Sequence, residues 1–167
     1  VFISRVDCDL RNLCKVKALI EKYRPHSVIH LAAKTGGVKA NALENADFFS
    51  ENVQINTNVL ESAAKAGVKR LISVLSSCAF PVVQGKTLTE DDLQTGTPYH
   101  GHLGYGSSKR MLDIQSRLLS EQYGVEFTTI TPVTMYGPWD DFDLEHSHVI
   151  GGLIHKCYLA EIGRAHV

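Results

Sequence analysis

The sequence predicts an α/β fold with a doubly wound parallel sheet. Short apolar runs typical of buried strands alternate along the chain with longer stretches of helical periodicity. A long polar loop follows one of these apolar runs, and doubly wound sheets bind their ligands in loops that follow the carboxyl ends of strands. Both observations favour a ligand-binding α/β domain.

Four segments have the composition expected of strands: residues 2–4, 27–33, 70–75 and 125–132. The first is expected to be only the end of a strand, and the second to be central in the sheet. Helical periodicity extends over residues 11–23, and a long helix is expected over residues 46–66, where Gly67 provides a C-cap. A polar loop over residues 81–102 then leads to a helix that carries Tyr105 and Lys109.

The composition is that of an ordinary soluble enzyme domain. With 167 residues, 44% of them hydrophobic, the chain is long enough for one sizeable core, and its net charge is −1. We find no basic block that would indicate nucleic-acid binding, no apolar run of membrane-spanning length and no signal-peptide pattern at the first residues. The expected location is therefore the cytoplasm. The four cysteines are dispersed and are expected to be free thiols without a structural metal: Cys8, Cys14, Cys78 and Cys157.

Tyr105 and Lys109 are the most informative pair in the sequence. Residues four apart lie on one face of a helix, so Lys109 can lie under Tyr105 and, together with the charge of a cofactor, lower the pKa of its phenol from about 10. Ser76, at a strand end, would orient a carbonyl oxygen. The same spacing also occurs in amphipathic helices as a core tyrosine and a solvated lysine. The order of strand, serine, loop, helix and strand favours proton transfer to a carbonyl, which is the chemistry of short-chain dehydrogenases.

Beyond this trio, residues 5–156 resemble the GDP-L-fucose synthases, a family of extended short-chain dehydrogenases. Six segments carry the resemblance: residues 30–37 (HLAAKTGG), 52–58 (NVQINTN), 76–81 (SSCAFP), 105–109 (YGSSK), 136–138 (YGP) and 147–150 (SHVI). The resemblance implies a Rossmann-like sheet that is truncated at both ends. Residues 1–161 are expected to be a partial NAD(P)-binding domain without its first strand, its Gly-rich loop and the substrate domain, and residues 162–167 resemble a translated sequencing adapter.

The resemblance also implies a reaction and residues that perform it. Cys78 is expected to be the base and His148 the acid that epimerise carbons 3 and 5 of GDP-4-keto-6-deoxy-D-mannose, and NADPH then reduces the 4-keto group to give GDP-L-fucose. Tyr105 would donate the proton, with Ser76 and Lys109 in support. Without the resemblance, Cys78 would be interpreted as a small buried side chain and His148 as a surface residue near a helix start.

Eight residues are expected to bind NADP(H): Arg5, Asp9, Leu10, Leu31, Ala32, Ala33, Tyr105 and Lys109. Asp9 and Leu10 resemble the family's adenine-contacting loop, and residues 31–33 end the strand beneath the pyrophosphate. Arg5 lies close to where the family recognises the 2′-phosphate, although a solvated arginine is the alternative. Asn52 and Asn58 are expected to shape the long helix rather than to bind a ligand.

Three further residues are expected to bind the nucleotide sugar: Ser77, Thr134 and Lys156. Lys156 matches a position that meets the diphosphate, and a solvated helix lysine is the alternative. The sequence departs from the family at Thr134, Trp139 and Asp141, so the resemblance implies the class of reaction and leaves the identity of the sugar open. The resemblance suggests a homodimer. Two alternatives remain: another extended dehydrogenase, such as a nucleotide-sugar 4-epimerase or 4,6-dehydratase, and a non-catalytic fragment.

Overall fold

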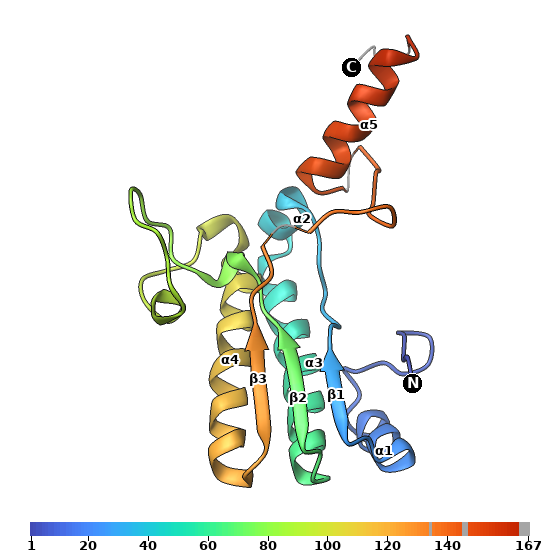
Figure 1. Cartoon of the computed structure of the whole chain (residues 1–167), viewed down its shortest axis with the longest axis vertical. Helices are drawn as coiled ribbons and strands as arrows, with labels where there is room; N and C mark the ends of the chain where they lie inside the picture. The colour runs from blue at the N-terminus through green and yellow to red at the C-terminus, as the bar shows by residue number, and fades with distance from the viewer. Residues whose placement is uncertain (134, 145–146, 164–167) are drawn as a thin grey trace.

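The computed structural model describes residues 1–133, 135–144 and 147–163. Its strands are β1 (Ser27–His30), β2 (Arg70–Val74) and β3 (Glu126–Ile130), and they form a parallel sheet in the order β1-β2-β3 (Figure 1). The predicted α/β fold with a parallel sheet is confirmed. β1 is shorter than the predicted strand, because the chain leaves the sheet after His30.

The helices are α1 (Leu13–Tyr23), α2 (Val38–Leu43), α3 (Asn45–Lys65), α4 (Leu103–Tyr123) and α5 (Val149–Glu161), with 3-10 turns η1 (Ser77–Ala79), η2 (Glu90–Asp92) and η3 (His100–His102). Local sequence sets several helix ends. The side chain of Asn12 caps α1 by accepting a hydrogen bond from the backbone N–H of Lys15. Gly67, with φ of +75°, follows α3, and Gly124, with φ of +64°, ends α4, because glycine adopts this left-handed conformation without a steric penalty.

One face of the sheet carries the core. Leu71 and Phe127, paired in register on β2 and β3, are buried with side chains from α1, α3 and α4, among them Val16, Leu60 and Leu112. The opposite face is exposed in the described part of the chain and carries three isoleucines: Ile29, Ile72 and Ile130. Successive side chains of each strand therefore point alternately to the packed face and to the exposed face of the sheet, as expected for a strand.

The predicted strand end at residues 2–4 is wrong. Phe2 is 86% exposed, and the backbone N–H and the hydroxyl of Ser4 both donate to the carboxylate of Asp7. These bonds close a turn over residues 5–7 instead of extending the chain along a neighbouring strand.

Three loops leave the carboxyl ends of the strands at the same edge of the sheet (Figure 1). The loop after β1 leads to α2, the loop after β2 begins with η1, and the segment after β3 leads to α5, which projects beyond this edge. No helix among the described residues is both long and apolar enough to cross a membrane. This edge is where parallel α/β sheets bind ligands, so it is where a site is expected.

Candidate functional site

The turn η1 follows β2 after two residues, and it carries the predicted Cys78 and has the predicted Ser76 as its N-cap residue. Ser76 has extended backbone, and its hydroxyl accepts a hydrogen bond from the backbone N–H of Cys78 at 3.2 Å, which caps the turn. Ser76 and Cys78 are partly buried, whereas Ser77 is exposed. The cap fixes the two partly buried side chains on one short, folded segment.

Helix α4 brings Tyr105 and Lys109 to this turn. The Lys109 ammonium donates to the carbonyl of Val74, the last residue of β2, at 2.7 Å, and its Nζ lies 5.7 Å from the centroid of the Tyr105 ring. Lys109 is only 3% exposed, and burial lowers its pKa to about 8. The predicted stacking of lysine under tyrosine is therefore present in the structure.

The pKa of the Tyr105 phenol depends on its burial and on two neighbours, Ser76 and Cys78. Burial raises the pKa of Tyr105, and the neighbouring Cys78 raises it further, while a side-chain hydrogen bond with Ser76 lowers it. The sequence predicts a lowered pKa in combination with the charge of a cofactor, and in this structure the net shift is upward because burial dominates. Tyr105 thus keeps its proton at neutral pH and is available as a proton donor.

Two glycines allow α4 to pack closely against the segment at Cys78 and the start of α3. A Cβ at Gly106 would collide with the carbonyl oxygen of Cys78, and a Cβ at Gly104 would collide with the backbone of Asn45 at the start of α3. Asn45 also holds the start of α4, since its Oδ1 accepts from the N–H of Gly104 at 2.5 Å and its Nδ2 donates to the carbonyl of His100 at 3.1 Å. Tyr105 lies between these two contact points, so its position is set by backbone packing on both sides.

Near Lys109, the side chains of His30 and Asn56 form a buried polar pair. His30, the last residue of β1, forms a hydrogen bond through Nε2 with Oδ1 of Asn56 at 3.0 Å, and Asn56 Nδ2 donates to the carbonyl of Ser108 at 3.5 Å. Burial lowers the pKa of His30 to about 4, and the nearby charge of Lys109 acts in the same direction. His30 is therefore neutral at physiological pH, and it connects β1 to the helix segment next to Lys109.

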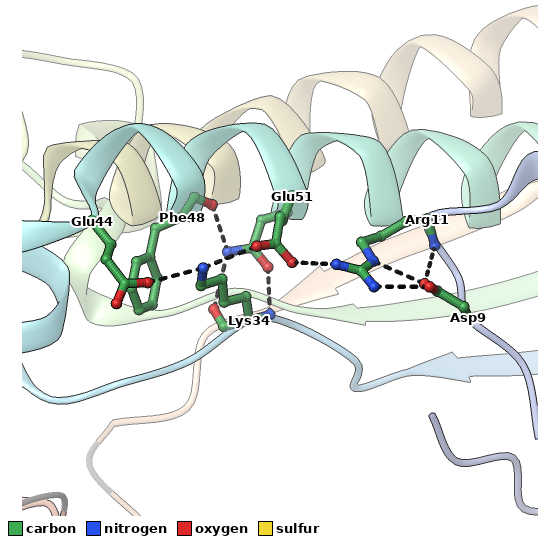
Figure 2. Close-up of polar contacts among 7 residues, drawn as sticks. Asp9, Arg11, Lys34, Glu44, Phe48 and Glu51 are labelled. Carbon is green, nitrogen blue, oxygen red and sulfur yellow. Dashed lines mark hydrogen bonds and ion pairs between the residues drawn. The ribbon is translucent and has the colours of Figure 1, made fainter. Parts of the chain in front are cut away.

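A chain of ion pairs lies along the start of α3, and we call it the α3 ion-pair chain (Figure 2). Arg11 donates to both carboxylate oxygens of Asp9 and, through Nη1, to Glu51 at 3.0 Å. Lys34 continues the chain, because its Nζ lies 2.9 Å from Glu51 and 3.1 Å from Glu44. Hydrogen bonds from Arg11 hold the pKa of Asp9 far below its usual value, and the partners Glu51 and Glu44 raise the pKa of Lys34.

The two asparagines expected to shape α3 do so through backbone contacts. Asn52 is fully buried, and its amide bonds both the N–H of Lys34, at 2.8 Å, and the carbonyl of Lys34, at 3.0 Å. Asn58 donates to the carbonyls of Leu10 and Arg11 at 2.9 and 3.0 Å. Helix α3 therefore positions both segments predicted to hold the cofactor, one before α1 and one after β1.

The other predicted residues are distributed around this core of the site. Arg5 is exposed in the turn over residues 5–7, and its charge acts on Asp9; Leu31 and Ala32 are exposed beyond β1, and Ala33 is partly buried. His148 is the exposed N-cap residue of α5, and Lys156 is exposed on the same helix. No hydrogen bond among the described residues joins His148 to Cys78, and Thr134 lies outside the described residues. The structure therefore groups Ser76, Cys78, Tyr105 and Lys109, and leaves the helix-α5 residues apart from them.

The residues present fit a dinucleotide such as NADP(H). Asp9 accepts three hydrogen bonds from Arg11, two on Oδ1 and one on Oδ2, so its carboxylate retains capacity for one further donor such as an adenine amino group. Leu31 and Ala32 present apolar surface at the carboxyl end of β1, the edge at which doubly wound sheets bind dinucleotides. Lys109 and Tyr105 lie at the corresponding end of β2.

Sequence reasoning missed His30, Asn45, Asn56, Gly106 and the ion-pair partners of Lys34. One signal was available for part of this set: asparagine favours caps and turns over helix interiors, so several asparagines inside one predicted helix indicate side chains that bond to neighbouring segments. The close approach at Gly106 has no such signal, because it depends on the path of a distant loop.

The chain is similar to proteins of one known family. The model of the NAD dependent epimerase/dehydratase family matches residues 3–165. Among curated proteins, a GDP-L-fucose synthase of Dictyostelium discoideum is 41% identical over 160 residues, which are 96% of this chain and 50% of the relative. A GDP-L-fucose synthase of Sinorhizobium fredii is 35% identical over 97% of this chain and 52% of the relative.

Solved structures show the same relationship. A crystal structure of a GDP-L-fucose synthetase from Naegleria fowleri bound to NADP has a TM-score of 0.89 and 40% identity, and it covers 98% of this chain and 50% of that one. A GDP-D-glycero-L-gluco-heptose synthase from Campylobacter jejuni, in the presence of NADPH, has a TM-score of 0.91 and 30% identity over 97% of this chain and 47% of that one. The chain thus spans about half the length of the relatives that it matches.

Proposed function

The chain belongs to the NAD dependent epimerase/dehydratase family, and on that premise we propose that it is part of a cytoplasmic, NADPH-dependent epimerase-reductase that converts GDP-4-keto-6-deoxy-D-mannose to GDP-L-fucose. The observation that carries the proposal is the grouping of Ser76, Cys78, Tyr105 and Lys109 at the carboxyl end of β2. It is supported by 41% identity to a GDP-L-fucose synthase along almost the whole chain.

Epimerisation is the first half of the proposed reaction. The Cys78 thiolate removes the proton from carbon 3, next to the 4-keto group, and the electron pair of the broken C–H bond forms an enolate. Hydrogen bonds from Ser76 and Tyr105 stabilise the enolate oxygen. His148 delivers a proton to the opposite face of the carbon, which inverts it. Cys78 then releases its proton to solvent and His148 takes up a proton from solvent, so the same two groups can act at carbon 5. This step requires α5 to bring His148 to the sugar when the substrate is bound.

Reduction is the second half. When bound, NADPH supplies the hydride that reduces carbon 4. Tyr105 donates its proton to the carbonyl oxygen, and its raised pKa keeps that proton available until the oxygen becomes basic. Lys109 holds the nicotinamide ribose, Asp9 and Leu10 contact the adenine, residues 31–33 lie against the pyrophosphate, and Arg5 binds the 2′-phosphate. Ser77, Thr134 and Lys156 bind the nucleotide sugar.

We propose that the full-length protein is a homodimer that pairs through α3 and α4. Three exposed apolar side chains, Met111, Ile114 and Leu118, follow a helical spacing along the outer face of α4. Exposed apolar stripes of this kind favour burial against a partner surface.

The full-length protein, incubated with GDP-4-keto-6-deoxymannose and NADPH in D₂O, tests the proposal. The wild-type protein should incorporate deuterium at carbons 3 and 5 and yield GDP-L-fucose. Cys78→Ser should lose the deuterium at both carbons. Tyr105→Phe should take up deuterium more slowly, because Ser76 alone then stabilises the enolate oxygen, and it should lose reduction. Cys157→Ser, at an exposed position on α5, is the matched control. Deuterium uptake that persists in Cys78→Ser would refute the assigned base.

A second candidate substrate is another GDP-linked 4-keto sugar. Trp139 is 99% exposed beside residues 136–138, which match a family motif, and a Campylobacter jejuni heptose synthase is among the structural relatives. The same assay with a GDP-4-keto-heptose distinguishes the two, since kcat/KM should be higher for the true substrate.

A further inference from the structure

Arg110 follows Lys109 on α4 and makes an unusual set of contacts. Its guanidinium donates to three backbone carbonyls: those of Ala79 at 2.5 Å, Thr95 at 2.9 Å and Gly96 at 2.9 Å. No carboxylate pairs with it among the described residues, and burial lowers its pKa. The planar guanidinium has several N–H groups in fixed directions, so it can bond to two chain segments at once, which an ammonium group cannot reproduce.

The three carbonyls belong to the two ends of the loop between the turn and α4. Ala79 is the last residue of η1, directly after Cys78, and Thr95 and Gly96 lie where the loop returns. An antiparallel bridge between Pro81 and Pro98 closes the loop beside them. Arg110 therefore fastens both ends of this loop to the helix that carries Tyr105.

Arg110 also acts together with Gly106. Residues 106 and 110 are four apart, so they lie on one face of α4, next to the face formed by residues 105 and 109. Gly106 contacts the carbonyl of Cys78, and Arg110 binds the carbonyl of the following residue. One helix face thus presents Tyr105 and Lys109 to the site, and the neighbouring face holds the turn on which Ser76 and Cys78 lie.

We propose that Arg110 is a positioning residue that fixes Ser76 and Cys78 relative to Tyr105, and so supports both proton transfers. The role in catalysis rests on the proposed function, whereas the role in holding the turn does not. Without the guanidinium, the Ala79 carbonyl loses its donor and η1 is free to shift from Tyr105. A displacement of about 1 Å at a reacting group reduces rates by roughly a hundredfold.

The test uses Arg110→Gln and Arg110→Lys in the full-length protein, with Arg117→Gln as the matched control. Arg117 lies on the same helix, is exposed and makes one ion pair, with Asp113. The first measurement is the rate at which iodoacetamide alkylates Cys78, followed by peptide mass mapping, with the exposed Cys14 and Cys157 as references in the same molecule. Arg110→Gln should alkylate Cys78 several-fold faster and leave the two reference rates unchanged.

The second measurement separates positioning from general stability. In Arg110→Gln, kcat for reduction should fall about a hundredfold and the KM for NADPH should stay within about twofold, with Arg110→Lys intermediate. Arg117→Gln should match the wild type in both. If Arg110→Gln does not fold, the test relies on Arg110→Lys. Wild-type values of both the Cys78 alkylation rate and kcat in Arg110→Lys would then overturn the proposal.

A lowered melting temperature without a change in Cys78 reactivity or kcat would also overturn it, because that result describes a purely structural contact. If the wild-type protein does not turn over the GDP-sugar, the proposed function fails, and the alkylation rates of Cys78 still decide whether Arg110 holds the turn.

Discussion

The starts of α3 and α4 both hold segments at the same edge of the sheet, but they do so by different physical means. At α3, the ion-pair chain joins long side chains that are 25% to 50% exposed. At α4, backbone contacts at Gly104 and Gly106 and the buried Lys109 leave little room for adjustment. Exposed ion pairs tolerate the loss of a partner and are screened by salt, whereas close packing does not relax. We therefore expect the α4 region to be sensitive to single substitutions and the α3 chain to be tolerant.

The largest effect is expected for Gly106→Ala. The added Cβ meets the carbonyl oxygen of Cys78 and lies 3.0 Å from Cβ of Pro98, so either the turn or the helix must move. Reductase kcat should fall by about a hundredfold or more, and the free energy of unfolding by about 1–3 kcal/mol, as for an overpacked core. Enzyme assay and urea denaturation measure the two quantities. Gly137→Ala is the control, because a Cβ there meets no atom within 4 Å; equal losses in both variants would contradict the proposed close contact.

A pH-dependent effect is expected at Lys109. Its pKa of about 8 means that the ammonium loses its proton just above neutral pH, so the activity that depends on this charge should fall as the pH rises through 8. Lys109→Arg retains the charge throughout this range and should lack the fall, at a lower overall rate. The profile of kcat/KM from pH 6 to about 10 checks this expectation. If kcat/KM of Lys109→Arg still falls above pH 8 as in the wild type, the fall belongs to the titration of another group.

His30 should make stability depend on acid pH. Its pKa is about 4 in the folded protein and 6.5 in the reference state, so between these values the unfolded chain binds a proton that the folded chain does not. The contribution is fully present above pH 6.5 and is lost as the pH falls towards 4. Between pH 7 and 5 it amounts to about 2 kcal/mol. Urea unfolding at both pH values should show a smaller loss in His30→Gln than in the wild type or in His26→Gln, whose side chain is exposed.

The smallest effect is expected in the α3 ion-pair chain. Arg11→Gln removes the ion pairs to Asp9 and Glu51, and the KM for NADPH should rise by roughly twofold to fivefold, the range typical of partly exposed pairs. The difference from wild type should shrink as NaCl is added. Lys17→Gln, at an exposed position on α1, is the control. If Arg11→Gln lost as much activity as Gly106→Ala, the start of α3 would not be more tolerant of substitution than the start of α4.

The sequence was sufficient for features that depend on local pattern. Helix α3 was predicted over residues 46–66 and begins and ends within one residue of that range, because its apolar period and Gly67 are both visible in the sequence. The meeting of Ser76 with Tyr105 was predictable because strand ends and the following helices share one edge of a parallel sheet. The upward shift in the pKa of Tyr105 was not predictable from the sequence, because it depends on how deeply α4 is buried. Similarly, Arg11 and Glu51 are 40 residues apart and meet only through the packing of α1 on α3.

Asn52 shows how the edge of the sheet is set. Its side-chain amide has the same donor and acceptor as a peptide group, and it bonds the N–H and the carbonyl of Lys34 as an adjacent strand would. The chain can therefore turn out of the sheet after His30 without leaving those two polar groups unpaired against α3. At Lys34, helix α3 thus supplies the pair of hydrogen bonds that a neighbouring strand would supply, so a helix side chain holds the loop that follows β1.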